Sequence, residues 1–368
     1  MFAHLFNQPK AKGSHLKLTT LIFTGFVIPS AFAWQAEKIA SGFTLPWAIA
    51  YVDEQTLLVT EREGIIKRLD LTTGKQTPLA EINVVAKGQG GLLDIAKSPF
   101  TKGTYYFTYS KNQQGQSATT LAMARYQDGK FSQWQDLLVT DSRSNTTRHF
   151  GSRITFDQSS VYFTLGDRGE RENGQNTQTH AGSILRLNPD GSIPKTNPFI
   201  NNPKVRDEIY SYGHRNPQGI WYDSQTKQLW SIEHGPRGGD EINLIQAGAN
   251  YGWPITSHGQ EYWGPFDVGE AKEKPGIESP VKVYVPSIAP GSLVLYRGDK
   301  FPELNGKLIA GALKLMHLNV ITLNEQNQAI DEQRLLENLN ERIRDLEITP
   351  AGDILFATDN GKIYRLIR

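Results

Sequence analysis

The sequence lacks cysteine altogether and has only 3 methionines among 368 residues. Without a thiol, the chain cannot form disulfides, thiolate metal sites or a lipoprotein anchor, and it cannot use a cysteine nucleophile. It also lacks a charge excess of either sign, because 39 Lys and Arg nearly balance 38 Asp and Glu. This balance argues against a general nucleic-acid or acidic-membrane partner, so any basic site must be local.

Long hydrophobic runs are absent except near the N-terminus, where one spans residues 18–32. The basic region before it consists of Lys10, Lys12, His15 and Lys17. An Ala-Phe-Ala cleavage pattern ends the run, which predicts a signal peptide over residues 1–33 and a mature chain from Trp34. An uncleaved membrane anchor is the alternative, but the run is short for a span and contains Gly25 and Pro29. No second run is long enough to cross a bilayer, and export without disulfides fits a bacterial periplasm.

Helical periodicity is also lacking, whereas 34 Gly and 19 Pro favour turns and short strands. One layout recurs along the chain: an apolar strand, a polar turn, and an alternating strand. It occurs in residues 57–69, 161–187, 229–245 and 354–366. Each copy is interpreted as an inner strand that faces a centre, followed by an outer strand that faces solvent. Diverged repeats of this kind predict a β-propeller.

The predicted fold is all-β, a six-bladed β-propeller with four-stranded antiparallel blades, because blades of about 45–60 residues give roughly six over the mature length. The matching repeats at both ends suit a ring closed by the terminal strands. No linker or charge run marks a boundary, so residues 34–368 are expected to form one domain. An array of β-sandwiches is the alternative. The long loops at 167–182 and 233–240 are expected on one face of the ring, where a propeller has its site.

The loop at residues 213–219, Gly-His-Arg-Asn-Pro-Gln-Gly, is a candidate ligand site. Arg215 offers a fork of donors, and Asn216 and Gln218 add two amides, which together suit a planar, oxygen-rich ligand. The alternative is a simple turn, in which Asn-Pro only marks the bend of the chain and binds no ligand. By itself the segment therefore suggests binding without deciding it.

The loop at residues 233–243 suggests a metal site. Gly235 and Pro236, with two more glycines close behind, force a tight and exposed backbone, and exposed carbonyls are hard oxygen ligands suited to Ca²⁺. Glu241 offers a carboxylate, and the carbonyl of Tyr251 could serve the same purpose. A glycine-rich bend with a surface carboxylate is the alternative.

Cations gather again near the C-terminus. If residues 341–345 form a strand, alternation places Arg342 and Arg344 on one face, where like charges repel unless an anion lies between them. The alternative is a solvated face on which Asp345 neutralises the arginines. Lys314 is a further cation at the end of an apolar segment, although a lysine there usually only reaches solvent.

His149, immediately before a Gly-Ser turn, is the candidate base, because an unperturbed histidine titrates near pH 6.5. Asp167 ends a neighbouring strand and could orient it. A surface histidine without a role is the alternative. Gln89, on a glycine turn, is uninformative by itself. Together these segments predict one basic, calcium-binding pocket with a histidine base.

Seven short segments, taken in order, resemble the soluble glucose and aldose sugar dehydrogenases that depend on pyrroloquinoline quinone (PQQ). They are Gly88-Gln-Gly-Gly-Leu-Leu, His149-Phe-Gly, Ser211-Tyr-Gly-His-Arg-Asn-Pro-Gln-Gly, Glu233-His-Gly-Pro-Arg-Gly-Gly-Asp-Glu-Ile-Asn, Asn250-Tyr-Gly-Trp-Pro, Gly311-Ala-Leu-Lys and Arg342-Ile-Arg-Asp. The likeness runs from about Leu45 to the C-terminus. Residues 235–243 resemble the aldose sugar dehydrogenase branch more closely than the glucose enzyme.

The resemblance implies a six-bladed propeller with PQQ lying across the top of the ring. It implies that His149 is the base and Asp167 its acidic partner, with Glu172 as the alternative partner. The residues implied to contact PQQ are Gln89, Arg215, Asn216, Tyr262, Lys314, Arg342 and Arg344. The residues implied to bind calcium are Gly235 and Pro236, through their carbonyls, for an ion that touches PQQ, and Glu241 and the Tyr251 carbonyl for a second, structural ion. Arg148 stands where the glucose enzyme has an acidic residue, which implies a different substrate preference.

The implied reaction is oxidation of an aldose at its anomeric carbon to a lactone. His149 takes the hydroxyl proton while hydride leaves the same carbon for PQQ, and calcium polarises the quinone carbonyl. A separate electron acceptor reoxidises the cofactor, and the protein is expected to be a monomer or homodimer. Two other functions fit a propeller. One is a calcium-dependent lactonase or other hydrolase, which does not need the cations, and the other is a carbohydrate-binding scaffold, in which His149 is dispensable.

Overall fold

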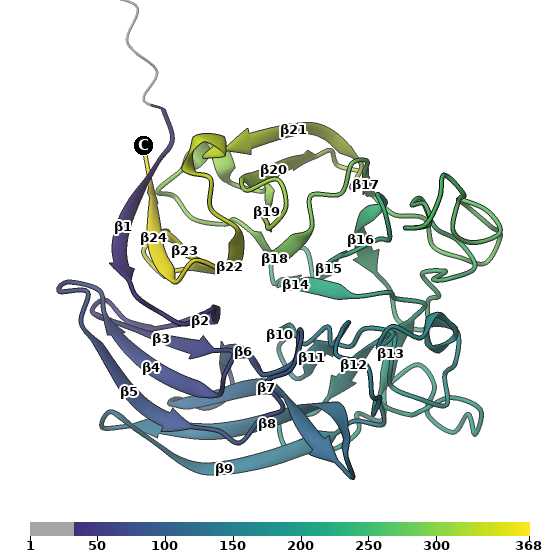
Figure 1. The fold of residues 1–368 in the computed structure, drawn as a ribbon, viewed down its shortest axis with the longest axis horizontal. Coiled ribbons are helices and arrows are strands. Elements are labelled where there is room, and N and C mark those ends of the chain that lie inside the picture. The colour runs from purple at the N-terminus through teal and green to yellow at the C-terminus, as the bar shows by residue number, and fades with distance from the viewer. Residues whose placement is uncertain (1–32) are drawn as a thin grey trace, which may run out of the picture. The chain divides into compact units, whose positions relative to one another are not determined.

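The computed structural model describes residues 33–368, which form six four-stranded antiparallel sheets arranged as the blades of one ring (Figure 1). The predicted all-β, six-bladed propeller is therefore confirmed. From the innermost strand outward, the first three blades are β2 (Pro46–Asp53), β3 (Thr56–Glu61), β4 (Ile65–Asp70) and β5 (Gln76–Glu81); β6 (Leu92–Lys97), β7 (Thr104–Gln113), β8 (Gln116–Gln127) and β9 (Lys130–Val139); and β10 (Ile154–Phe156), β11 (Val161–Thr164), β12 (Ser183–Leu187) and β13 (Ile209–Tyr212). The other three are β14 (Pro217–Asp223), β15 (Gln228–Glu233), β16 (Asp240–Ile245) and β17 (Lys282–Tyr284); β18 (Pro290–Leu295), β19 (Leu308–Ala312), β20 (Leu318–Leu323) and β21 (Ala329–Leu335); and β22 (Ile343–Ile348), β23 (Ile354–Thr358), β24 (Lys362–Ile367) and β1 (Gln35–Ser41). Three short 3-10 helices complete the described chain: η1 (Arg171–Gly174), η2 (Pro302–Leu304) and η3 (Glu337–Leu339).

The ring is closed by the two ends of the described chain. β1 is the outermost strand of the blade formed by β22, β23 and β24, and Gln35 lies opposite Ile367 in its antiparallel pairing with β24. Residues 34–368 form one compact unit. The predicted signal peptide lies outside the described residues, except for Ala33. In residues 33–368, no helix is both long enough and apolar enough to cross a membrane.

One expectation about the repeats is wrong, because the recurring layout is not an inner and an outer strand. Residues 57–69 cover β3 and β4, which are the second and third strands of their blade. The innermost strands are β2, β6, β10, β14, β18 and β22, which lie side by side around the axis. The second and third strands pack between blades and so share an apolar pattern, whereas the innermost strands line the axis, where Asp94 of β6 and Asp345 and Glu347 of β22 interrupt that pattern.

The hydrophobic core consists of six clusters, one between each pair of neighbouring blades. Leu58 of β3 packs with Phe107 of the second blade, whereas Leu57 packs with Leu355 of the last blade. Successive side chains of a strand point to opposite faces, so these two leucines are buried against different neighbours. A blade packed on both faces explains why its strands read as continuous apolar runs.

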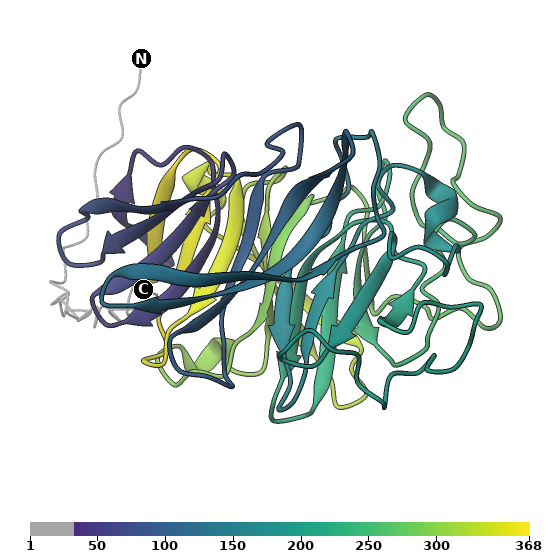
Figure 2. The same cartoon turned by 90° about the horizontal axis from the view of Figure 1, so that it is seen from below.

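Antiparallel alternation divides the connections between two faces of the ring. Loops from the second to the third strand, and loops from the fourth strand to the next blade, emerge on the same face, here called the site face. The site-face loops that matter below are residues 82–91, 140–153, 165–182, 213–216, 234–239, 313–317, 336–342 and 359–361. In Figure 2, which views the ring from the side, this face is uppermost and carries η1. Both long loops predicted to share a face do so.

Arg153 lies at the axis and joins five of the six blades. Its guanidinium contacts Asp94 Oδ1 (3.0 Å), Asp345 Oδ1 (2.8 Å) and the carbonyls of Gln218 (3.1 Å), Gly291 (2.6 Å) and Arg344 (2.7 Å). Asp345 Oδ2 accepts the N–H of Ile49 at 2.8 Å and so reaches the remaining blade. These bonds satisfy backbone groups on strand edges that no further strand can pair. Asp345 therefore pairs with Arg153, and the alternative in which it neutralises Arg342 and Arg344 is wrong.

Candidate active site

His149 lies in the site-face connection between β9 and β10, where two residues hold it. Its backbone has a φ of +56°, and its N–H donates to Gln89 Oε1 at 2.7 Å. Its ring Nδ1 lies 2.6 Å from Asp167 Oδ1. Nε2 makes no hydrogen bond to the part of the chain that the structure describes, and 12% of the side chain is exposed. This nitrogen is therefore free to meet a ligand.

Asp167, in the β11–β12 connection, is the acidic residue that contacts His149. It is almost fully buried, and Oδ1 also accepts the N–H of Gly169 at 2.6 Å. Oδ2 accepts the indole N–H of Trp253 at 2.8 Å. Glu172, the other candidate partner, is exposed on η1. The carboxylate of Asp167 is thus fixed by three donors, one of them the histidine ring.

The electrostatics of this pair favour a neutral histidine. Burial lowers the pKa of His149 below 6.5; the hydrogen bond to Asp167 opposes this shift, and the charge of Arg215 reinforces it. Burial acts to raise the pKa of Asp167, but its bonds with His149 and Gly169 hold that pKa below 3.8. Asp167 is therefore ionised at neutral pH and fixes the imidazole proton on Nδ1. The lone pair of Nε2 is left to accept a proton.

Arg215, just before β14, lies beside this pair. Its carbonyl accepts the N–H of Asp167 at 2.8 Å, and its guanidinium carbon lies 5.3 Å from the centre of the Trp253 ring. Nη1 donates to the carbonyl of His234 at 3.1 Å. Nε is buried and has no partner within residues 33–368. Because a buried donor without a partner is costly, this nitrogen indicates a place where a ligand acceptor would be favoured.

Arg342 and Arg344 share one carboxylate on the site face. Their Nε atoms each lie 2.8 Å from an oxygen of Asp359, so both side chains point to one side, as strand alternation predicts. The anion between them is a residue of the protein, so their repulsion does not by itself require an anionic ligand. Two arginines and one aspartate leave one positive charge in excess.

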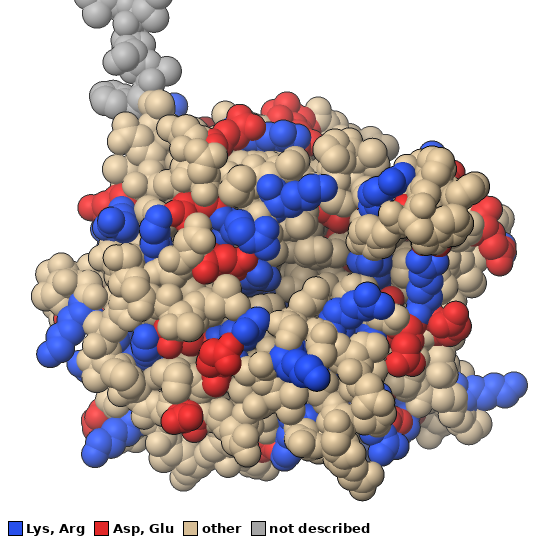
Figure 3. Space-filling model, viewed as in Figure 1, with Lys and Arg blue, Asp and Glu red and all other residues tan. Residues whose placement is uncertain are grey.

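The other predicted cofactor residues make fewer contacts with the His149 site. Asn216 Oδ1 accepts the N–H of Gly151 at 3.2 Å, which places it beside the His149 loop. Lys314 is exposed in the β19–β20 connection, and Tyr262 is 67% exposed in the β16–β17 connection. No hydrogen bond or ion pair within residues 33–368 links these last two side chains to the rest of the site. Figure 3 shows the site face, where Lys and Arg surround a central hollow with Asp and Glu among them.

The four predicted metal ligands lie around one small cavity, although the resemblance implies two separate ions. The cavity is lined by Gly235, Pro236, Glu241 and Tyr251, and by Arg215 and Glu233. Burial, and then the charge of the neighbouring Glu233, raise the pKa of Glu241 to about 8. Residues 33–368 contain no group of three His, Cys, Asp or Glu side chains placed to hold a metal. An ion here would therefore depend on carbonyl oxygens as well.

Sequence reasoning assigned no role to Asp359, and it considered Trp253 only as an aromatic that stacks on a sugar ring or fills the core, not as the donor to Asp167. Asp359 lies in an Asp-Asn-Gly segment that reads as a hairpin turn. The sequence could have indicated that Asp359 belongs to the site, because its turn joins the second and third strands of a blade and such turns lie on the site face. Trp253 is buried, and nothing in the sequence distinguishes an indole that orients a carboxylate from one that only fills the core.

Comparison with known proteins decides the class. The profile of the family described as glucose/sorbosone dehydrogenase matches residues 43–365. The chain belongs to this family. An aldose sugar dehydrogenase of Escherichia coli is 36% identical over 326 residues, which cover 86% of this chain and 87% of that protein.

Solved structures of this glucose/sorbosone dehydrogenase family share the fold. The apo soluble aldose sugar dehydrogenase from Escherichia coli superposes with a TM-score of 0.87 at 34% identity, covering 91% of this chain and 99% of that one. The PQQ-bound aldose sugar dehydrogenase from Streptomyces coelicolor has a TM-score of 0.75 at 27% identity and covers 91% and 97%. The resemblance to sugar dehydrogenases is confirmed, and the protein is an oxidoreductase of this family.

Proposed function

We propose that this oxidoreductase converts aldose sugars to lactones, with PQQ as its cofactor, Ca²⁺ bound beside it and His149 as the base. The observation that carries the proposal is the His149–Asp167 pair, at 2.6 Å, next to the unused donor of Arg215. The PQQ-bound structure of the Streptomyces relative supports the choice of cofactor.

The residues present fit PQQ, a planar tricarboxylate. Arg215, Arg342 and Arg344 offer guanidinium forks suited to carboxylates, and Arg215 has a buried nitrogen without a partner in residues 33–368. Gln89, Asn216, Lys314 and Tyr262 are further contacts that we propose on the site face. When bound, PQQ supplies a quinone that accepts hydride from the sugar.

The chain's own chemistry is proton transfer at His149. Its Nε2 accepts the proton of the anomeric hydroxyl while hydride leaves the attached carbon, so that carbon and oxygen form the lactone carbonyl. Asp167 holds Nδ1 and stabilises the imidazolium that results. Trp253 and Gly169 keep the carboxylate in place through the transfer.

We propose that calcium binds in the cavity lined by the carbonyls of Gly235 and Pro236, with Glu241 and the Tyr251 carbonyl as ligands of a second, structural ion. The adjacent carboxylates of Glu233 and Glu241 support this, because a hard cation relieves their repulsion. Calcium near the quinone would act as a Lewis acid.

We also propose that residues 1–33 are a signal peptide and that the mature chain works in the periplasm as a monomer or homodimer. The basic region, apolar run and cleavage pattern support export. A separate electron acceptor would then reoxidise the cofactor after each turnover.

The test is aldose-dependent reduction of an artificial dye by the mature protein, with PQQ and Ca²⁺ added singly and together. Activity is expected only with both, and chelation should lower the thermal midpoint of the holoprotein.

Glu241→Gln should reduce the stabilisation by added Ca²⁺, whereas Glu325→Gln, which changes an exposed glutamate in the β20–β21 turn, should not. Hydrolysis of a lactone without dye reduction would instead favour the lactonase. Absence of any activity or PQQ spectrum would favour the scaffold.

The lowered pKa of His149 predicts the pH dependence of kcat/KM. As the pH falls through this pKa, Nε2 gains a proton and activity should be lost, so the acid limb should lie below pH 6.5. Asp167→Asn removes the charge that favours the imidazolium and should shift the limb to still lower pH. An acid limb near pH 7 in the unmodified protein would contradict a neutral base.

A further inference from the structure

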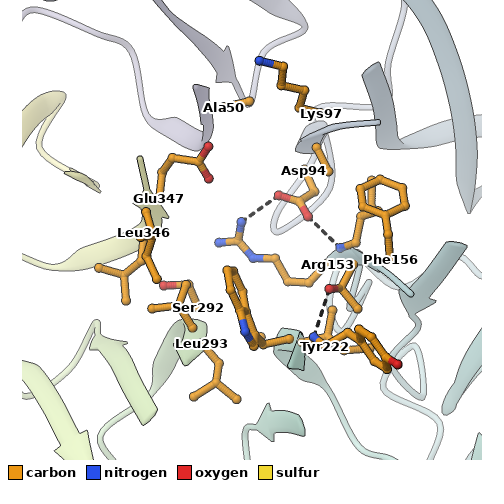
Figure 4. Close-up of a pocket in the computed structure, with 18 of the residues that line it drawn as sticks. Ala50, Asp94, Lys97, Arg153, Phe156, Tyr222, Ser292, Leu293, Leu346 and Glu347 are labelled. Atoms are coloured by element: carbon orange, nitrogen blue, oxygen red, sulfur yellow. Dashed lines mark hydrogen bonds and ion pairs between the residues drawn. The ribbon is translucent and has the colours of Figure 1, made fainter. Parts of the chain in front are cut away.

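A second cavity follows the axis of the ring on the side away from the site face. Its volume is about 500 Å³, and all six innermost strands contribute to its wall (Figure 4). Pro99, Gln158 and Ser224 line it as well. These three residues belong to connections from the first to the second strand of a blade, which emerge opposite the site face. The cavity therefore opens on that opposite face.

Arg153 separates this cavity from the candidate active site. Its guanidinium forms the inner end of the cavity with Asp94 and Asp345, and it also binds the carbonyls of Gly291 and Arg344 on the site-face side. These bonds span the axis, and the axial cavity shares no lining residue with the cavity beside Arg215. A molecule in the axial cavity would thus not reach the His149 site through the ring.

Glu347 is the carboxylate in this cavity with spare hydrogen-bonding capacity. Its Oε1 accepts the N–H of Tyr51 at 2.8 Å, while Oε2 has no partner among residues 33–368. Figure 4 shows its carboxylate pointing into the cavity. Lys97, the nearest cation at the mouth, donates to the carbonyl of Val52 at 2.8 Å and forms no ion pair with Glu347.

The rest of the wall is largely apolar. The aromatic and aliphatic side chains among the lining residues include Phe156, Trp221, Tyr222, Leu293 and Leu346. Four acids line the cavity, Asp94, Asp157, Asp345 and Glu347, against two cations, Arg153 and Lys97. A cavity with apolar walls and an excess of carboxylates complements a molecule that has an apolar body and a positive group.

We propose that the axial cavity is a second ligand site, which takes a small organic cation whose ammonium group pairs with Glu347 and whose apolar body lies against the aromatic wall. The site is independent of sugar oxidation. Burial raises the pKa of Glu347 to about 8, so without a ligand this carboxyl retains its proton near neutrality. A bound cation displaces a proton from Glu347, and its affinity should rise with pH.

The test is calorimetric titration of the mature protein with phenethylammonium, in parallel with 2-phenylethanol, which has the same ring and no charge. At pH 8.5 the cation should bind about tenfold more tightly than the alcohol, and its affinity should fall at pH 6.5. The other charged groups that line the cavity around Glu347 are Asp94, Asp157, Asp345, Arg153 and Lys97, of which Asp345 also titrates in this range.

Glu347→Gln keeps an acceptor for the Tyr51 N–H and should reduce binding of the cation to that of the alcohol, whereas Glu325→Gln should change nothing. Dye reduction should be the same in both variants. Equal binding of cation and alcohol, an unchanged Glu347→Gln variant, or no binding of either probe would overturn the proposal. If Glu347→Gln does not fold, the comparison of probes and of pH in the unmodified protein still decides it.

Discussion

Replacing His149 with glutamine should lower kcat by about 10²–10⁴-fold, the usual contribution of a general base. Glutamine is similar in length but cannot accept the hydroxyl proton. Binding of PQQ should persist, because the arginines proposed to hold it remain in place. Steady-state dye reduction measures the first effect, and a spectral titration with PQQ measures the second.

Two observations would contradict this account of His149. Turnover retained alongside normal PQQ binding would show that another group takes the proton. Loss of PQQ binding together with turnover would show that the histidine serves the cofactor and not the proton. Asp167→Asn is the companion variant, since it keeps the shape of the partner but removes its charge and replaces one acceptor oxygen with an amide donor.

Replacing Arg153 with methionine should lower the free energy of unfolding by about 3–5 kcal/mol, the range for breaking a buried ion pair. The change leaves Asp94 and Asp345 without their cation and three backbone carbonyls without a donor. Denaturant unfolding measures the loss. The deficit should shrink as the pH falls, because burial raises the pKa of both carboxyls and protonation removes their charge.

Arg125→Met is the matched control. Arg125 is exposed on β8 and its side chain bonds only to Gln127 within residues 33–368, so its loss should cost less than about 0.5 kcal/mol. Equal effects of the two substitutions would show that the axial bonds of Arg153 are replaced by water and do not hold the blades together.

The limits of sequence reasoning are clearest at the three arginines near the axis. Arg342 and Arg344 stand out because two like charges lie two positions apart where β22 begins, yet their shared partner, Asp359, comes from the next hairpin. Arg153 gives no signal at all, since its partners outside its own blade lie between 59 positions away, at Asp94, and 192 positions away, at Asp345. A side chain whose partners are so distant along the chain cannot be interpreted from its neighbours in sequence.

The repeating apolar strands and glycine turns were enough to indicate a propeller, because each repeat must bury both faces against a neighbour, whereas the number of blades came from the usual blade length and the family resemblance. The order of the polar loops was enough to determine the family. Only the tertiary structure decided that Asp167 and not Glu172 contacts His149, and that the predicted metal ligands share one cavity. It alone placed an acid-rich cavity on the opposite face. These features depend on distances between loops of different blades, and such distances exist only once the ring has closed.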